Sequence, residues 1–287
     1  MTSDCAVIIP HFNDTVRLRR CLSALVSGDI AGADIVVVDN ASTDAMDALR
    51  SDFPQARFVT EARKGAANAR NRGVAETDAP HLFFLDADCV PAADWLAAAM
   101  RNRDLGDIVG GAITVFDETP PPRSGAQAFE TVFAFNYRDY ILNKGFSVTA
   151  NLLTRRDVFL ATGPFIDGVS EDEEWCRRAR DAGFRIALAE DLRVSHPTRS
   201  DWPALRRKWR RLTDEMFRLH LTRSGRARWA LRAVAVAASG AAHLPRVLAD
   251  IRLDGPGERL RGCGTLVRLR LLRAVWMLQQ AAGRTIR

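Results

Sequence analysis

The sequence predicts an α/β fold in which a largely parallel sheet carries helices on both faces, followed by a helical extension at the C-terminus. Short apolar runs alternate with helical patterns over the first 115 residues, and such alternation builds parallel sheets. The runs IVVV and HLFFL are also almost continuously apolar, which is typical of strands buried on both faces. Together these two observations define the fold class.

The expected elements run in a regular order along the chain. Strands are expected at residues 6–10, 34–39, 57–60, 81–86 and 108–115. Helices are expected between them at residues 16–27, 43–52, 65–76 and 92–101. Ser42 or Thr43 is the expected N-cap of the second helix. After a mixed region, helices are expected at residues 201–221, 227–248 and 260–282, with a break at Pro256 and Gly257.

Charge divides the chain into two regions. Residues 1–200 contain 22 Lys and Arg against 29 Asp and Glu, whereas residues 201–287 contain 19 against 6. Such asymmetry indicates regions with different roles. The five cysteines are scattered and lack a CxxC pair, which disfavours a zinc site and favours a reducing compartment.

The chain has no predicted secretory signal, because no basic segment and long apolar stretch stand at its N-terminus. The longest uncharged run near the C-terminus, residues 233–245, has 13 residues, whereas a membrane-spanning helix needs about 20. We therefore expect a cytoplasmic protein.

Polar side chains follow three of the predicted strands. They are residues 10–13, then Asp39 and Asn40, then Asp86 and Asp88. The carboxyl ends of parallel strands meet at one edge of a sheet, where α/β proteins bind ligands. A single aspartate there is also typical of a helix cap, but three such strand ends together predict a site.

Asp86 and Asp88 have the spacing that binds a hard divalent cation and a diphosphate. Mg²⁺ and Mn²⁺ favour oxygen ligands, commonly one or two carboxylates together with substrate phosphates. The motif is weak by itself and gains weight from its place after a buried strand. His196, in RVSHPT, is either structural, as isolated histidines more often are, or a further ligand to the cation.

Asp39 and the segment KGAANARNRG offer groups for a nucleotide. The Asp39 carboxylate can accept a hydrogen bond from the N3–H of uracil or thymine, or it can cap the next helix. Lys64 stands where a predicted helix begins, and a helix N-terminus with a cation suits a phosphate. Arg70 is either a second phosphate ligand or a solvated helix charge.

The segment SEDEEW begins another predicted helix. Ser170 and Glu173 have the spacing of a capping box, which places Glu171 and Asp172 in the first turn. The helix dipole alone favours acids there. The second acid beside the box also suits a general base, which needs a carboxylate aimed at the hydroxyl that it deprotonates.

These motifs together resemble those of family 2 glycosyltransferases with the GT-A fold. The resemblance covers about residues 5–200, and its elements come in the family order: VIIPHFND, VVVDNAST, KGAANARNRG, FLDADC, TANLLTRRDVFLATGPFID and SEDEEWCRRARDAGFRI. It implies a catalytic domain at residues 1–200, with a nucleotide-binding part at 1–115 and an acceptor part at 116–200. Residues 201–287 would form a basic helical extension.

The resemblance also implies roles for individual residues. The residues implied or proposed to contact the nucleotide sugar are Pro10, Phe12, Asn13, Asp39, Lys64, Arg70, Asp86 and Glu171. Asp39 would face uracil, Asp88 and His196 would hold Mn²⁺ or Mg²⁺, and Asp172 would be the catalytic base. His11 and Phe12 depart from the family pattern, in which a small or apolar residue and a tyrosine are more usual.

The implied reaction is inverting transfer of a sugar from a nucleotide diphosphate sugar, with UDP favoured, to a hydroxyl of a glycan or lipid-linked acceptor in cell-surface polysaccharide biosynthesis. A sugar-phosphate nucleotidyltransferase is a rival, but PHFNDTVRLRR lacks the Gly-rich loop that it needs near the first strand. A dehydrogenase is disfavoured for want of GxGxxG. The non-enzymatic alternative is a scaffold protein that has kept the fold without catalysis. The presence of Asp39, Asp86, Asp88 and Asp172 argues against it.

The basic extension contains two segments, WPALRRKWRRL and LVRLRLLRAVWML, that place tryptophans among arginines. Basic amphipathic helices with interfacial tryptophan are typical of proteins that lie on an anionic membrane surface. Two other interpretations are together about as well supported as membrane binding. The helices could form a packing layer on the catalytic domain, or they could form a homodimer interface. No nucleic-acid recognition fold is visible, so nucleic acid is not expected as a partner. We expect peripheral attachment to the inner face of the cell membrane.

Overall fold

The computed structural model describes residues 3–286, except for the side chains of residues 221–224. The chain forms two compact units. The first comprises Met1–Thr114, Asn136–Asp167 and Glu171–His196, and the second comprises Val115–Phe135, Gly168–Ser170 and Pro197–Arg287. Residues 115–135, which the sequence places in the acceptor part of the catalytic domain, thus belong to the second unit together with the basic extension.

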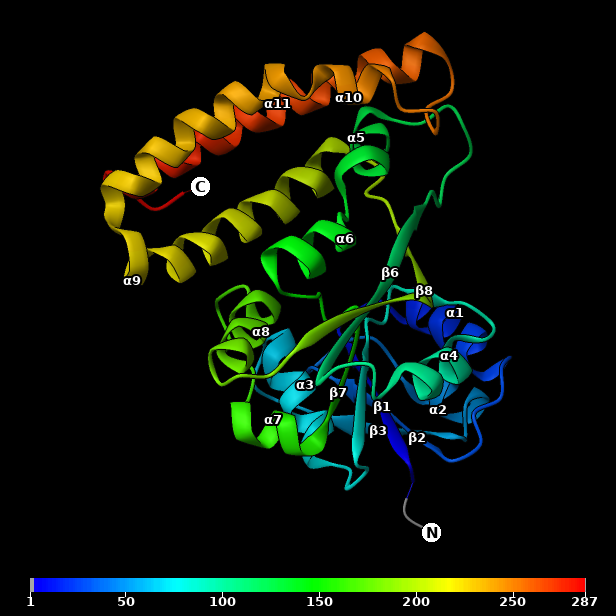
Figure 1. Cartoon of the computed structure of the whole chain (residues 1–287). Coiled ribbons are helices and arrows are strands. Elements are labelled where there is room, and N and C mark those ends of the chain that lie inside the picture. Colours follow the sequence, from blue (N-terminus) through cyan, green and yellow to red (C-terminus); the bar gives the residue numbers. More distant parts are fainter. Residues whose placement is uncertain (1–2, 287) are drawn as a thin grey trace. The chain divides into compact units, whose positions relative to one another are not determined.

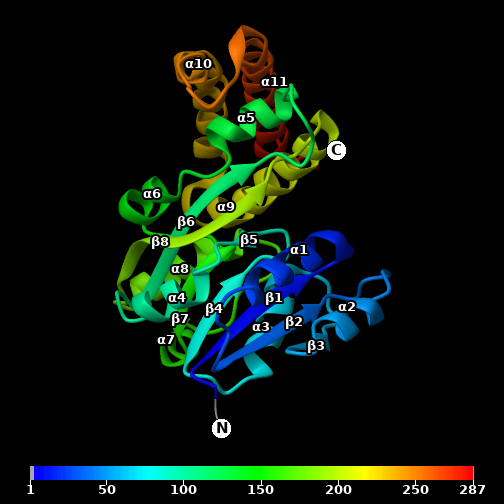
Figure 2. The same ribbon diagram turned by 90° about the vertical axis from the view of Figure 1, so that its right-hand side faces the viewer.

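The first unit is built on an eight-stranded sheet with the strand order β3-β2-β1-β4-β7-β6-β8-β5. The strands are β1 (Cys5–His11), β2 (Ala33–Asp39), β3 (Ala56–Thr60), β4 (His81–Leu85), β5 (Val90–Pro91), β6 (Ile108–Phe116), β7 (Asn151–Arg155) and β8 (Ile186–Pro197). Strands β3, β2, β1 and β4 are parallel neighbours, and Figure 2 shows β1, β2 and β3 side by side. The pairs β4–β7, β6–β7 and β5–β8 are antiparallel.

The predicted α/β class is confirmed, and the five predicted strands correspond to β1, β2, β3, β4 and β6. The parallel arrangement is confined to the half of the sheet that carries the regular strand–helix alternation. Strands β5, β7 and β8 are absent from the prediction and supply the antiparallel half. Their partners are distant in sequence, so local periodicity gives little sign of them.

Helices cover both faces of this sheet (Figure 1). They are α1 (Thr15–Val26), α2 (Asp47–Asp52), α3 (Ala66–Ala75), α4 (Trp95–Asn102), α7 (Arg156–Thr162) and α8 (Glu171–Asp181). The unit also contains the short helix α6 (Tyr137–Asp139) and the π-helical turn η1 (Tyr140–Lys144). Neighbouring residues of β4 point to opposite faces. Phe84 packs edge-on against Phe165 at 5.2 Å between ring centroids, whereas Phe83 packs edge-on against Trp95 of α4 at 6.3 Å.

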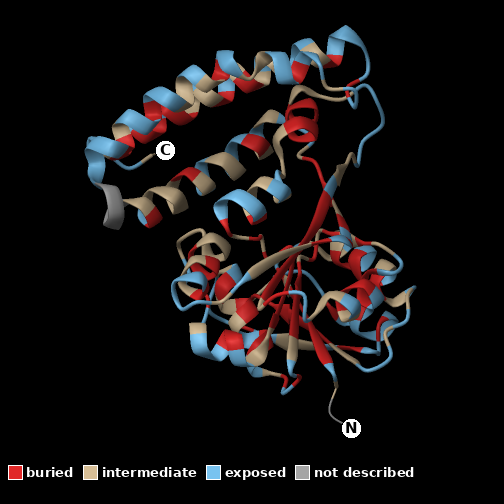
Figure 3. Ribbon diagram, viewed as in Figure 1, coloured by how far each residue is buried: buried red, intermediate tan, exposed pale blue. Residues whose placement is uncertain are grey.

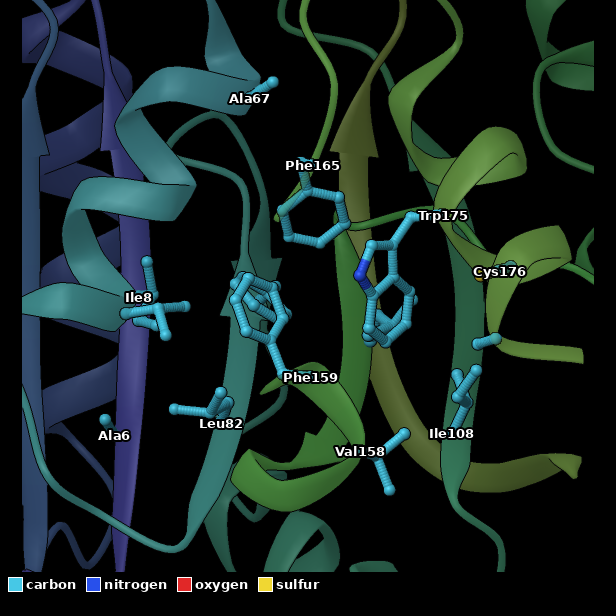
Figure 4. Close-up of a cluster of buried hydrophobic side chains, with 14 of the residues drawn as sticks. Ala6, Ile8, Ala67, Leu82, Ile108, Val158, Phe159, Phe165, Trp175 and Cys176 are labelled. Atoms are coloured by element: carbon cyan, nitrogen blue, oxygen red, sulfur yellow. The ribbon is translucent and has the colours of Figure 1, made fainter. Parts of the chain in front are cut away.

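The largest described core of the first unit lies under α3, α7 and α8 (Figure 4). Trp175 of α8 is fully buried and stacks on Phe159 of α7 at 5.8 Å. Its indole N–H donates to the carbonyl oxygen of Gly163 at 2.9 Å, so its polar atom is satisfied as well. This packing fixes α8 against the sheet and thereby places the N-terminus of α8, where Glu171 and Asp172 lie.

The second predicted helix is shorter than expected, and its predicted N-cap is wrong. Helix α2 begins only at Asp47, after Met46. The backbone N–H of Thr43 instead donates to Asn13 Oδ1 at 2.8 Å, and Ser42 Oγ accepts from the backbone N–H of Asn13 at 2.9 Å. The two residues therefore tie the loop after β2 to the loop after β1.

The second unit is helical and contains α5 (Gly125–Phe133), α9 (Trp202–Ala242), α10 (Leu244–Leu248) and α11 (Gly255–Ala281). Helix α9 spans two predicted helices, which meet at a kink where Gly225 has φ 68°, a conformation that favours glycine. The expected break between the last two predicted helices is present at residues 249–254. It precedes Pro256 and Gly257, which both lie in the first turn of α11, where a missing N–H costs nothing. Buried and exposed stripes alternate along these helices (Figure 3).

A buried charge pair joins α5 to α9 inside this unit. Glu130 is 1% exposed, and it accepts from Lys208 Nζ at 2.5 Å and from the backbone N–H of Arg199 at 2.6 Å. Burial raises the pKa of Glu130, but Lys208 and Arg199 lower it by more, so the pKa lies below its usual range. Removing one partner of such a pair typically costs about 3–5 kcal/mol.

The tryptophans of the basic extension belong to the packing of this unit. Trp276 is only 2% exposed, so its predicted interfacial role is wrong. Trp202 and Trp209 lie half-buried beneath the guanidinium groups of Arg268 and Arg273, at 3.9 and 4.2 Å from the ring centroids. Within residues 3–286, no helix is both long enough and apolar enough to cross a membrane.

Candidate active site

The carboxyl ends of β2, β1 and β4 meet at one edge of the sheet, because these strands are parallel neighbours. In the register of β1 and β2, His11 stands directly beside Asp39. Their side chains touch, with His11 Nδ1 at 3.3 Å from Asp39 Oδ1, and both residues are buried. The expectation that the polar strand ends gather at one edge is met for these three strands.

Asn13 uses one side-chain atom to join the loops after β1 and β2, and its side chain is exposed. Its Oδ1 accepts from the backbone N–H of Thr43, and its backbone has φ 47°, a left-handed conformation that asparagine tolerates. Asn13 thus fastens two loops through its Oδ1, and its contact with the nucleotide remains a prediction. Pro10 pairs with Val38 within the sheet and is partly exposed.

Phe12 and Lys64 form an exposed pair beside these loops. The ring of Phe12 is 51% exposed, and Lys64 Nζ lies 5.8 Å from its centroid. Asn40, which is predicted only as one of the polar residues at the strand ends, positions the chain around Lys64. Its side-chain N–H groups donate to the carbonyls of Glu61 and Arg63, and its Oδ1 accepts from Gly65 N at 2.7 Å.

A carboxylate lies beside the N-terminus of α3, which is predicted as a phosphate site. Gly65 has φ 127°, and a Cβ added there would lie 2.2 Å from Asp167 Oδ1. Asn71 of α3 holds the chain beside Asp167, because it exchanges two hydrogen bonds of 2.9 Å with the backbone of Phe165. Asp167 therefore lies close to Gly65 at the start of α3.

Arg70 is not a solvated helix charge, because it is buried and its charge is already paired with two carboxylates. It is 3% exposed, and its two terminal nitrogens donate to Asp86 Oδ1 at 2.6 Å and to Glu171 Oε1 at 2.9 Å. Burial lowers the pKa of Arg70, yet the two carboxylates raise it by more, so its pKa ends above the usual value. The guanidinium thereby joins the end of β4 to the start of α8.

Asp172 follows Glu171 in the first turn of α8. Its Oδ1 accepts from the backbone N–H of Glu173 at 2.8 Å, and a helix N-terminus stabilises negative charge. The Asp172 charge also raises the pKa of Arg70 and, after burial, that of Tyr140. Tyr140 begins the π-helical turn η1; such turns are frequent at functional sites, but their i→i+5 bonding leaves no pattern in a sequence.

Asp88 lies beside His196, with Asp88 Oδ2 at 3.2 Å from His196 Nε2. Two ligands that bind one Mg²⁺ or Mn²⁺ at right angles are about 3 Å apart, so this pair fits two neighbouring positions around such an ion. Among the described residues, no group of three or more His, Cys, Asp or Glu side chains could hold a metal ion. Protein donors would therefore be few, as is usual where substrate phosphates complete the coordination.

Asn151, at the start of β7, connects β8, the strand that carries His196, to β6 and α4. It is fully buried, its amide donates to the carbonyls of Ala112 and Leu192 at 3.1 and 2.9 Å, and its Oδ1 accepts from Trp95 Nε1 at 2.9 Å. It thus links β6, β8 and α4 through one side chain. The sequence shows only that TAN stands before an apolar run, so this role could not be read from it.

The chain belongs to the family Glycosyl transferase family 2, whose sequence model matches residues 6–163, more than half of the 287 residues. It is 29% identical over 218 residues to the glycosyltransferase AglE of Haloferax volcanii, covering 71% of this chain and 70% of AglE. It is 26% identical over 217 residues to the pre-mycofactocin glycosyltransferase of Mycobacterium tuberculosis, covering 70% of this chain and 45% of that protein.

Solved glycosyltransferases have a similar fold. S. aureus TarS 1–349 in complex with UDP-GlcNAc superposes with a TM-score of 0.55 at 16% identity, covering all of this chain and 93% of that one. The mannosyltransferase PcManGT of Pyrobaculum calidifontis, in complex with GDP-Man and Mn²⁺, superposes with a TM-score of 0.53 at 18% identity, covering all of this chain and 77% of that one. The likeness establishes the GT-A fold expected from the sequence.

Proposed function

We propose that the protein is an inverting glycosyltransferase that moves a sugar from a UDP-sugar to a hydroxyl of a glycan or lipid-linked acceptor in cell-surface polysaccharide biosynthesis. The observation that carries the proposal is the double ion pair of Arg70 with Asp86 and Glu171. One guanidinium reaches both carboxylates, so the residues after β4 and the first turn of α8 border the same region. That region would receive the donor sugar.

The base in this proposal is Asp172. In an inverting transfer the acceptor hydroxyl attacks the anomeric carbon on the face opposite the leaving diphosphate, so the base must stand on the acceptor side. Asp172 would accept the hydroxyl proton while the N–H of Glu173 holds its Oδ1. Arg70 would position it indirectly, by fixing the neighbouring Glu171.

The nucleotide would lie at the strand ends, with uracil toward Asp39 and against the exposed ring of Phe12. Lys64, close to that ring, would add positive charge near the phosphates. Asp88 and His196 would hold a divalent cation, which when bound neutralises the charge of the departing diphosphate. Asp86 would stay paired with Arg70 and line the ribose side.

Replacing Asp172 by Asn should lower turnover about 10²–10⁴-fold, since an amide cannot take up the proton. Nucleotide binding should not change, because Asp172 stands on the acceptor side. The measurement is UDP release from a panel of UDP-sugars, together with calorimetric titration of UDP. Glu173→Gln is the matched control, because it alters an acid in the same helical turn and keeps the N–H that holds Asp172. Near-normal turnover in Asp172→Asn would show that another group is the base.

Replacing Asp88 by Asn should remove most of the gain in UDP affinity that Mn²⁺ provides, and leave the weak metal-free binding unchanged. Calorimetric titrations of UDP with and without MnCl₂ measure both quantities. Asp94→Asn is the control, as this nearby carboxylate faces Arg193 at a half-exposed position. If Asp88→Asn retains the full Mn²⁺ effect, Asp88 does not hold the ion.

We further propose that the second unit rests on an anionic lipid surface at the inner face of the cell membrane. Leu271, Val275 and Leu278 form a stripe at i, i+4 and i+7 on α11 and are 52%, 50% and 47% exposed. Arg268 continues the stripe one turn earlier and is also exposed. Residues 201–287 carry 19 basic against 6 acidic side chains, which complements anionic headgroups.

Changing Leu271, Val275 and Leu278 together to Ser should weaken binding to phosphatidylglycerol-containing vesicles at least about tenfold, because their burial in the lipid interface is lost. Flotation at low and high salt measures the binding, which for the unaltered protein should fall as salt rises. Leu160→Ser is the control, since it alters a leucine on α7 that is 67% exposed. Absence of salt-sensitive binding by the unaltered protein would contradict the proposal, and loss of a dimer in the triple variant would identify the stripe as a subunit interface instead.

A further inference from the structure

His11 is the residue at the candidate site for which the family resemblance provides no role. It ends β1, is 2% exposed and faces three polar groups. Its Nε2 lies 3.1 Å from the backbone nitrogen of Asp14, and its Nδ1 lies 3.3 Å from Asp39 Oδ1 and 3.4 Å from Ser42 Oγ. A backbone N–H can only donate, so Nε2 must accept and Nδ1 carries the proton. His11 therefore donates to the Asp39 carboxylate.

This contact divides the two oxygens of Asp39 between different uses. Oδ1 receives the Nδ1–H of His11 and also faces the backbone N–H of Ser42 at 3.4 Å. An oxygen with two such donors has little capacity for a third. Among the described residues no donor to Oδ2 is recorded, and the Asp39 side chain is 11% exposed. A ligand would thus meet a carboxylate with one available oxygen.

We propose that His11 determines which nucleobase the protein accepts, by committing one oxygen of Asp39 to the protein. The inference rests on the proposed function, in which Asp39 faces the base. Uracil presents a single ring N–H between two carbonyl groups, which matches one oxygen. Guanine presents a ring N–H and an amino group side by side, and a carboxylate satisfies both only with its two oxygens. Guanine bound here leaves a donor unpaired, which costs about tenfold or more in affinity.

The inference is tested by titrating the full chain with UDP and with GDP at fixed MnCl₂. The unaltered protein should prefer UDP by at least about tenfold. In His11→Ala, Asp39 Oδ1 loses its side-chain donor. The ratio of UDP affinity to GDP affinity should therefore fall about tenfold, because GDP binds more tightly. His11→Asn keeps an N–H near the position of Nδ1 and should retain most of the preference. His81→Ala is the control, because His81 begins β4 at the opposite edge of the sheet.

The possible results separate this inference from the proposed function. The unaltered protein could bind UDP selectively while folded His11→Ala keeps the same ratio of UDP to GDP affinity. That result would overturn the role of His11 and leave the proposed function standing. A preference of the unaltered protein for GDP would overturn both the role of His11 and the UDP donor of the proposed function, and would leave glycosyl transfer itself standing. Binding of neither nucleotide would remove the proposed function, and the inference with it.

A measurement on the unaltered protein keeps the test decisive if His11→Ala does not fold. Long-range ¹H–¹⁵N spectra report which imidazole nitrogen carries the proton. The expected result is an Nδ1–H tautomer for His11 that persists when UDP is added. An Nε2–H tautomer would overturn the inference, since Nδ1 would then have no proton to donate to Asp39.

Discussion

The buried guanidinium of Arg70 is the interaction on which the candidate site depends. A charge that is almost fully buried persists only when it is paired, and Arg70 meets this condition with Asp86 at 2.6 Å and Glu171 at 2.9 Å. Its partners stand 16 and 101 residues away along the chain. One side chain on α3 thus fixes both the end of β4 and the start of α8. Asp88 and Asp172, two residues and one residue further along, inherit their positions from this arrangement.

The two halves of the sheet make different contributions to the site. Parallel strands β2, β1 and β4 end at one edge, close to Asp39, His11 and Asp86. The proposed function assigns Asp39 and Asp86 to the nucleotide side. The antiparallel half returns the chain to this region from the other direction. Strand β8 brings His196 to within 3.2 Å of Asp88, and the core around Trp175 fixes α8. The residues that the proposed function assigns to the nucleotide, the cation and the base are therefore positioned by both halves of one sheet.

Much of this organisation could be predicted from the sequence, because it is local. The parallel strands are continuous apolar runs, and Asp86 and Asp88 directly follow one of them. Contacts between distant segments could not be predicted. Arg70 looks like a solvated helix charge in KGAANARNRG, and only the folded chain places it between two carboxylates. Asn13 and Thr43 likewise look like a ligand group and a helix cap until the two loops meet. Tryptophans among arginines predict an interface, whereas in the folded chain Trp202 and Trp209 lie beneath guanidinium groups of the same unit.

The most direct test of the account is a crystal structure of the protein with UDP and Mn²⁺, with the ion located by its anomalous scattering. The account predicts a manganese peak between Asp88 and His196, the diphosphate on that ion, and Arg70 still bound to both Asp86 and Glu171. A manganese peak elsewhere, or an Arg70 side chain that leaves the two carboxylates to bind the diphosphate, would contradict the claim that this guanidinium joins the donor side to the base side.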